Sequence, residues 1–150
     1  LKKFNGLKYR QQIIYRSKSL TIINDSKATS YSSSVNILKS LTNVYWIVGG
    51  LAKKGDKFSL SKNDCKTFKA YIFGKDRRFF IKHFKGVMNY QYFKNLTFLL
   101  KKVLLDIKKE ENNEHKIILF SPAAASFDSF KNFEDRGKYF NNLIKKIIHV

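Results

Sequence analysis

Residues 117–137 read Ile-Ile-Leu-Phe-Ser-Pro-Ala-Ala-Ala-Ser-Phe-Asp-Ser-Phe-Lys-Asn-Phe-Glu-Asp-Arg-Gly and combine a strand, a tight turn and the start of a helix. The apolar run 117–120 is typical of a buried strand, and Pro122 ends it because proline has no N–H to donate to a neighbouring strand. In an open α/β sheet, ligands bind at the carboxyl ends of the strands. The turn is therefore either a ligand-binding loop or a closely packed structural turn in which Ser126 caps the next segment.

Strands and helices alternate along the rest of the chain. Patterns of apolar and turn residues predict a β-hairpin over 11–16 and 20–24, strands over 44–48, 71–74, 87–90 and 117–120, and helices over 33–41, 60–71, 75–83, 91–109 and 132–148. Such alternation favours βαβ units. We therefore predict an α/β fold with a three-layer, Rossmann-like, mainly parallel sheet, helices on both faces, and an N-terminal β-hairpin that supplies an antiparallel strand.

The composition describes a folded and strongly basic chain. Its 150 residues are 43% hydrophobic and 15% aromatic, and the formal net charge is +19. No apolar run reaches the roughly 18 residues that a membrane-spanning helix needs, so we expect neither a membrane span nor a secreted precursor. Cys65 is the single cysteine, which excludes an internal disulfide and fits a reducing, cytoplasmic compartment.

The positive charge leaves one alternative function open, that of a basic nucleic-acid-binding module. Most of the excess is lysine, and it is spread from Lys2 to Lys146 rather than gathered in one segment. The aromatic residues fall mainly in the predicted buried runs instead of alternating with lysine on one surface. We therefore expect no specific nucleic acid as a partner.

Three polar loops, 24–30, 49–56 and 121–133, follow three of the predicted strands. Because the carboxyl ends of parallel strands meet at one edge of a sheet, we expect these loops to share one face. Their ammonium and hydroxyl groups suit carboxylates, and one acidic group suits ribose hydroxyls. The donors are Lys27, Thr29, Lys53 and Ser126, and the acceptor is Asp25.

Several common catalytic motifs are absent from the sequence. It contains no Gly-x-x-x-x-Gly-Lys-Ser/Thr phosphate loop, no Gly-x-Gly-x-x-Gly dinucleotide motif and no Gly-x-Ser-x-Gly nucleophile elbow. The histidines, at 83, 115 and 149, lie away from the predicted strand ends and form no metal-ligand pattern with Cys65. We therefore expect no metal site, and the loops predict binding rather than proton transfer.

The three loops together resemble the C-terminal domain of the Mur ligase family, in the branch that adds D-glutamate. The resemblance is carried by Asn-Asp-Ser-Lys-Ala-Thr at 24–29, by Gly49-Gly50 with Lys53, and by the long block 121–137. The segment Phe-Asn-Gly-Leu at 4–7, leading to Arg10, is similar to the family's junction between central and C-terminal domains. The resemblance covers essentially all 150 residues.

The resemblance implies an ATP- and Mg²⁺-dependent ligase of peptidoglycan synthesis. Such a ligase phosphorylates the carboxylate of UDP-N-acetylmuramoyl-L-alanine, and the amine of D-glutamate then attacks the acyl phosphate. Arg10 and Asp25 would reach ATP, with Asp25 at the ribose. The residues implied to hold the two D-glutamate carboxylates are Thr29, Lys53, Ser126 and the main chain of Phe133, with Lys27 beside them.

The resemblance also implies a division into domains. Residues 1–10 would be an interdomain linker and 11–150 the C-terminal domain, while the N-terminal and central ATP-binding domains would be absent from this chain. The uridine nucleotide and most contacts to ATP and Mg²⁺ belong to those domains, so we expect no catalytic residue in this segment, no turnover by it alone, and a monomer. A related ligase that adds another amino acid is the remaining alternative.

Overall fold

A computed structural model of the chain describes residues 7–126 and 129–148. Its elements, in chain order, are β1 (Gln12–Arg16), β2 (Leu20–Asn24), α1 (Tyr31–Leu38), β3 (Val44–Gly49), β4 (Phe68–Phe73), α2 (Arg77–Phe84), β5 (Asn89–Tyr92), α3 (Leu96–Lys109), β6 (Lys116–Phe120) and α4 (Phe133–Ile148). The strands form one sheet in the order β1-β2-β6-β3-β4-β5. Strand β1 pairs with β2 in antiparallel orientation, and every other neighbouring pair is parallel. The predicted fold class is confirmed.

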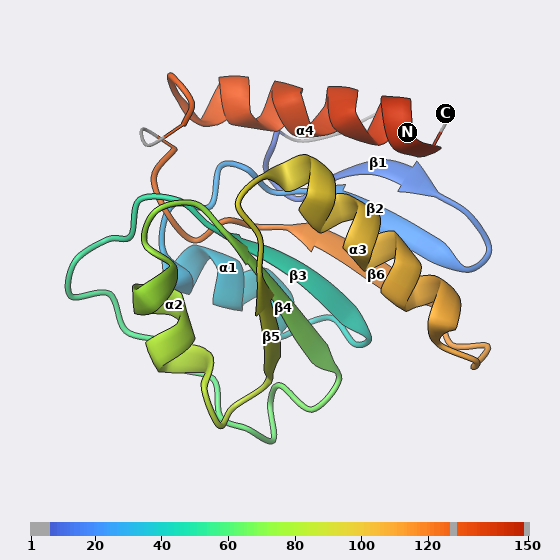
Figure 1. Cartoon of the computed structure of the whole chain (residues 1–150), viewed down its shortest axis with the longest axis horizontal. Helices are drawn as coiled ribbons and strands as arrows, with labels where there is room; N and C mark the ends of the chain where they lie inside the picture. The colour runs from blue at the N-terminus through green and yellow to red at the C-terminus, as the bar shows by residue number, and fades with distance from the viewer. Residues whose placement is uncertain (1–6, 127–128, 149–150) are drawn as a thin grey trace.

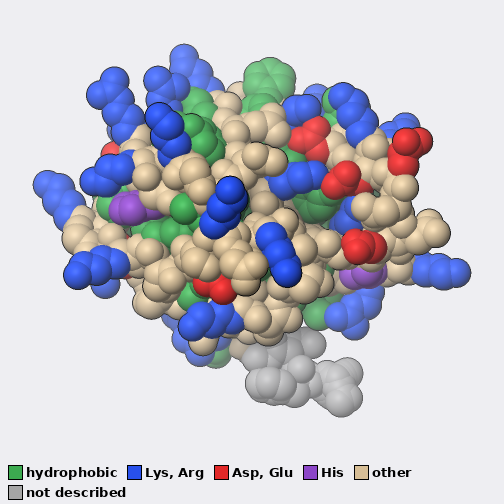
Figure 2. Space-filling model, turned by 90° about the horizontal axis from the view of Figure 1, so that it is seen from below, with side chains coloured by type: hydrophobic (Ala, Val, Ile, Leu, Met, Phe, Trp, Pro, Cys, Tyr) green, Lys and Arg blue, Asp and Glu red, His purple; other side chains and the backbone are tan. Residues whose placement is uncertain are grey.

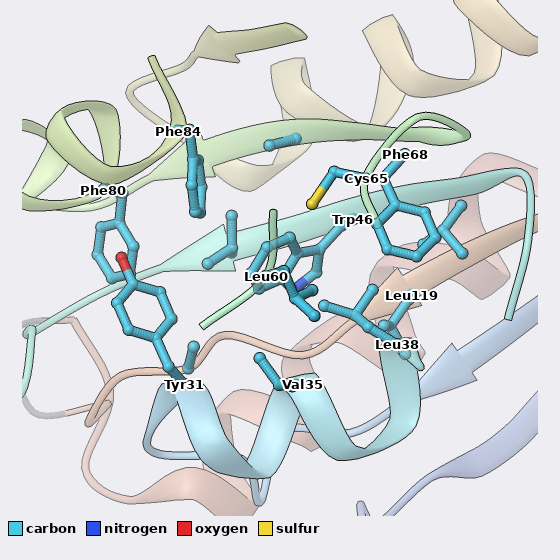
Figure 3. Close-up of a cluster of buried hydrophobic side chains, with 14 of the residues drawn as sticks. Tyr31, Val35, Leu38, Trp46, Leu60, Cys65, Phe68, Phe80, Phe84 and Leu119 are labelled. Carbon is cyan, nitrogen blue, oxygen red and sulfur yellow. The ribbon is translucent and has the colours of Figure 1, made fainter. Parts of the chain in front are cut away.

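Helices cover both faces of the sheet (Figure 1). Helices α1 and α2 pack on one face around Trp46, and α3 and α4 pack on the other around Phe120. Figure 3 shows the first core, where Tyr31 and Val35 of α1 point towards Trp46 and the phenylalanines Phe80 and Phe84. Strand β3 is buried along its whole length because it has strands on both sides and helices on both faces.

The predicted helix over 60–71 is wrong. The chain turns at 62–67, and β4 begins at Phe68 and takes up the last third of the segment. The turn is fixed by reciprocal bonds in which the Ser61 N–H donates to Asp64 Oδ2 at 2.8 Å and the Asp64 N–H donates to Ser61 Oγ at 3.1 Å. Phe68 and Ile72 join one core while Tyr71 joins the other, so burial on two faces overrides the local helical pattern.

Other predicted elements are present with shifted ends. Helix α1 begins at Tyr31 instead of residue 33, and α3 begins at Leu96 instead of residue 91. The later start of α3 follows from β5, which extends through Tyr92, and from Asn95, whose side chain accepts a hydrogen bond from the Phe98 N–H at 2.9 Å. The hairpin, β3, β6 and α4 lie within one residue of their predicted limits.

Strands β2, β6 and β3 are neighbours and run in the same direction, so their carboxyl ends form one edge of the sheet. The registers pair Asn24 and Ile47 with Phe120. The loops 24–30, 49–56 and 121–126 therefore leave the sheet side by side, as predicted. Among the described residues, no helix is long and apolar enough to cross a membrane.

Candidate functional site at the carboxyl edge of the sheet

The loops after β3 and β6 are joined by main-chain hydrogen bonds. The Leu51 N–H donates to the Ala125 carbonyl at 3.0 Å, and the Ala125 N–H donates to the Leu51 carbonyl at 2.9 Å. The Gly49 N–H donates to the Pro122 carbonyl at 2.9 Å. These bonds extend the β3–β6 contact beyond the sheet, so the two loops form one continuous structure.

The loop after β2 is attached to the same strand end through Asp25 and Ser121. The Asp25 N–H donates to the Phe120 carbonyl at 2.7 Å, and the Ser121 hydroxyl donates to Asp25 Oδ2 at 2.7 Å. Trp46 Nε1 donates to the Ser121 carbonyl at 2.7 Å, and Ser34 Oγ lies 2.6 Å from Ser121 Oγ. Ser121 thus connects the loop after β2 to the buried core and to α1.

Arg136 of α4 joins the first and third loops from the inside of the molecule. Its side chain is fully buried. Its Nε and Nη2 donate to the hydroxyl and the carbonyl of Ser26 at 3.0 and 2.6 Å, and Nη1 donates to the Ala124 carbonyl at 2.8 Å. A guanidinium has several donors in a fixed plane, so one side chain sets the spacing of both loops.

An open pocket of about 620 Å³ lies beside these loops. It is lined by residues from the segment before β1, the loop after β2, helix α1 and the start of α4, namely Arg10, Gln11, Asp25, Lys27, Ala28, Thr29, Ser33, Asn36 and Phe133. Its rim is cationic and hydroxylic, with Thr29 and Arg10 exposed. A pocket of this chemistry can hold a polar, anionic ligand.

Asp25 is the acidic group of the pocket and is almost completely buried. Its Oδ1 accepts a hydrogen bond from the Gln11 N–H at 3.0 Å, in addition to the Ser121 bond on Oδ2. Burial raises the pKa of the Asp25 carboxyl to about 6, although the two hydrogen bonds and the charge of Arg10 act in the opposite direction. Asp25 therefore ties the segment before β1 to the sheet edge.

The chain is similar to part of several curated ligases. No family model matches it. UDP-N-acetylmuramoylalanine--D-glutamate ligase of Francisella tularensis subsp. tularensis (strain SCHU S4 / Schu 4) is 36% identical over 151 residues, which cover 98% of this chain and 35% of the ligase. The ligase of the same name from Wolbachia sp. subsp. Brugia malayi is 36% identical over 147 residues, which cover 98% of this chain and 29% of the ligase.

The chain is homologous to the C-terminal part of these ligases. The resemblance to the Mur ligase family is therefore confirmed. The chain spans about a third of the length of the curated relatives that it matches.

Five of the seven residues implied by the Mur ligase resemblance line the pocket, namely Arg10, Asp25, Lys27, Thr29 and Phe133. Lys27 Nζ lies 4.5 Å from the centre of the Phe133 ring, a cation–π contact that holds the ammonium group over the start of α4. The Phe133 carbonyl accepts a hydrogen bond from the Ser26 hydroxyl at 2.8 Å. The Phe133 N–H lies in the first turn of α4, where N–H groups have no acceptor within the helix.

Lys53 and Ser126 do not line this pocket but lie in the two joined loops next to it. Lys53 is exposed and Ser126 is buried. The loop of Lys53 is held at both ends, since the Ala52 N–H donates to Asp76 Oδ2 at 2.8 Å and the Tyr31 N–H donates to Asp56 Oδ2 at 2.7 Å. Ser30 is the N-cap residue of α1, but its side chain makes no capping bond, so the Asp56 carboxylate accepts the hydrogen bond from the first N–H of the helix instead.

Some predicted features lie outside the described residues. These are positions 1–6 of the predicted linker, residues 127 and 128 of the block 121–137, and His149. The other histidines lie elsewhere, His83 beside the Tyr31 hydroxyl at 3.0 Å and His115 beside the Thr21 hydroxyl at 2.7 Å. Neither of them lines the pocket.

Sequence reasoning gave no role to Arg136, Ser121 or Asp56. A signal for Arg136 was present, because it shares the buried side of α4 with Phe140 and Leu143 at helical spacing, and a charged residue on an apolar helix face needs buried partners. Ser121 and Asp56 gave no such signal, since their partners are distant in the sequence.

Proposed function

We propose that the chain is the C-terminal domain of an ATP-dependent ligase that adds D-glutamate to UDP-N-acetylmuramoyl-L-alanine in peptidoglycan synthesis. The observation that carries this proposal is the homology over 98% of the chain to ligases named for D-glutamate. The physical support is the carboxyl edge of the sheet, where one bonded structure presents cationic and hydroxyl donors suited to a dicarboxylate.

In the proposed reaction, this domain holds and aims the acceptor. Lys53, Thr29 and Ser126, with the Phe133 N–H, bind the two carboxylates of D-glutamate, and Lys27 adds positive charge beside them. Fixing both carboxylates leaves one direction for the amine, so the L isomer directs its amine elsewhere. ATP with Mg²⁺ supplies the phosphoryl group that activates the alanyl carboxylate before the amine forms the amide.

Arg10 and Asp25 are proposed to contact ATP, with Asp25 at the ribose. Both line the pocket, and Asp25 keeps free lone pairs although each of its oxygens already accepts one bond. Within the described residues, no three His, Cys, Asp or Glu side chains come together. Mg²⁺ and most of the contacts to ATP are proposed to be held by the central domain of the ligase.

The site is proposed to be completed by other domains of the ligase, with the uridine nucleotide bound there. Thr29, Lys53 and Arg10 are exposed, and the pocket is open to solvent. A second domain closing over this edge would exclude water from the reacting groups. We propose that the chain alone does not turn over, and that the complete ligase acts as a monomer in the cytoplasm.

A chimeric ligase tests this function. The 150-residue chain replaces the matching C-terminal part of the Francisella tularensis ligase, and the chimera is supplied with ATP, Mg²⁺, UDP-N-acetylmuramoyl-L-alanine and one amino acid. We expect product by mass spectrometry with D-glutamate and none with L-glutamate, L-lysine or meso-diaminopimelate. The control is the Francisella ligase without its C-terminal part, which should be inactive.

Two results would contradict the proposal. A chimera that is soluble and folded by circular dichroism but forms no product with D-glutamate would contradict the assignment of this chain to a D-glutamate-adding ligase. A preference for another amino acid would instead identify a related ligase of different specificity.

A further inference from the structure

The outer surface of α3 and α4 carries large apolar side chains that face solvent. Phe98 and Leu105 on α3 are 62% and 49% exposed, and Tyr139 on α4 is 43% exposed. Phe98 and Leu105 are seven residues apart, or about two helical turns, so they lie on the same side of α3. The inner side of the same helix is buried through Leu99, Leu100 and Val103.

An open groove of about 600 Å³ runs between the two helices, which cover the same face of the sheet (Figure 1). Its apolar lining is formed by Tyr139, Leu143 and Ile147 of α4. Lys101 of α3 and Lys146 of α4 also line the groove. Both lysines are exposed. The groove thus combines apolar surface with two exposed ammonium groups.

The charge of this surface is positive. Helix α3 contains four lysines and one acidic residue, Asp106, whose carboxylate is paired with Lys102 at 2.7 Å. The acidic residues of α4 lie in its first turn, whereas its last turn carries Lys145 and Lys146. Figure 2 shows the side of the molecule opposite α4, where Asp and Glu side chains lie among the lysines and arginines.

We propose that the outer surface of α3 and α4 binds the surface of an anionic phospholipid bilayer. The lysines match the lipid phosphates, while Phe98 and Leu105 enter the boundary between headgroups and acyl chains. An acidic peptide in the groove is the competing occupant. A bound peptide explains the exposed apolar side chains less well, because Phe98 and Leu105 lie outside the groove. A flat bilayer would contact both side chains, whereas a peptide in the groove would contact neither.

Vesicle co-sedimentation tests this binding with the 150-residue chain. We expect it to bind vesicles of phosphatidylcholine with about 30% phosphatidylglycerol in about 0.1 M salt, and to bind pure phosphatidylcholine at least about tenfold more weakly. Phe98→Ser should weaken binding to the anionic vesicles about tenfold, because it removes an apolar group from the lipid boundary. Its matched control is Ile13→Ser, which removes a 48% exposed apolar side chain from β1 and should leave binding unchanged.

The charge is tested in the same way. Lys101→Glu with Lys146→Glu should weaken binding at least about tenfold, whereas Lys62→Glu with Lys66→Glu, which changes the net charge equally at exposed positions, should weaken it less than about threefold. No binding to anionic vesicles, or equal losses in the two double variants, would overturn the proposal. Binding of poly-L-glutamate without binding of vesicles would overturn it as well and assign the surface to an acidic protein.

Discussion

Arg136 is the residue on which the arrangement of the first and third loops depends. Its guanidinium donates to Ser26 twice and to Ala124 once, and all of these groups are buried with it. An apolar side chain of similar length would fill the space but would leave these oxygens without their donors. Buried acceptors that lose their donors cost stability and also release the loops.

We predict that Arg136→Met lowers the free energy of unfolding of the chain by at least about 3 kcal/mol, measured by urea titration of circular dichroism. Lys138→Met is the matched control, since it removes an exposed cation two positions further along α4 and should change stability by less than about 0.5 kcal/mol. Equal stability of the two variants would mean that Arg136 does not hold the loops.

Asp25 gives the site a pH dependence. Burial raises the pKa of its carboxyl from 3.8 to about 6, so the folded chain binds a proton more tightly than the unfolded chain. Between about pH 4 and pH 6 the folded state therefore carries the additional proton, and stability falls as the pH rises through this window. The full contribution is present below pH 4 and lost above pH 6.

We predict that Asp25→Asn removes this pH-dependent component, which amounts to about 3 kcal/mol. Asparagine keeps an oxygen for the Gln11 N–H, and its amide can donate to the Ser121 hydroxyl. The measurement is the difference in unfolding free energy between the natural chain and the variant at pH 4, 5, 6 and 7. Asp135→Asn, at an exposed position, should leave the profile unchanged, and a difference for Asp25→Asn that stays constant with pH would refute the prediction.

At the scale of elements, the end of β3 has to pass close to β4. Gly49 has a φ of +143°, and a Cβ built there would lie 2.0 Å from the Phe73 carbonyl oxygen. That atom belongs to the backbone of the neighbouring strand and cannot move aside. A side chain at residue 49 would therefore separate the two strands beside the loop of Lys53.

We predict that Gly49→Ala destabilises the chain by more than about 3 kcal/mol, measured by thermal and urea unfolding. The matched control is Gly55→Ala, where φ is +79° and no atom lies within 4 Å of the added Cβ. This control carries the cost of a positive φ alone, about 1 kcal/mol. Similar losses in both variants would show that the contact between β3 and β4 is not the cause.

The order of elements and the meeting of the three loops follow from sequence patterns, because alternating strands and helices allow few topologies. The helix predicted over 60–71 was wrong because Phe68, Tyr71 and Ile72 owe their positions to the sheet on either side, which no local pattern encodes. The start of α3 was misplaced for a similar reason, since β5 is held by β4 and has an uneven local pattern.

The candidate site was predictable to the extent that its residues lie in the polar loops after β2, β3 and β6. The roles of those residues came from the family resemblance, since donors such as Thr29 and Lys53 are ordinary loop residues. The bonds that arrange the loops were not predictable, because they join residues such as Asp25 and Ser121 that are 96 positions apart.

The molecule as a whole presents two surfaces with different proposed tasks. The carboxyl edge of β2, β6 and β3 presents the loops proposed to bind D-glutamate, and the outer side of α3 and α4 presents lysines and exposed apolar groups. A variant of one surface should therefore leave the function of the other intact.

The central claim is that the bonded loops at the carboxyl edge hold D-glutamate. The most direct measurement is kcat/KM for D-glutamate in the chimeric ligase with Lys53→Ala, Ser126→Ala or Lys54→Ala. Because a charged hydrogen bond contributes about 1.5 to 3 kcal/mol, we predict a loss of about 10- to 100-fold for Lys53→Ala. Ser126→Ala should also lose activity, whereas Lys54→Ala, which removes the neighbouring exposed lysine, should be unchanged. Unchanged kinetics in both Lys53→Ala and Ser126→Ala would contradict the claim.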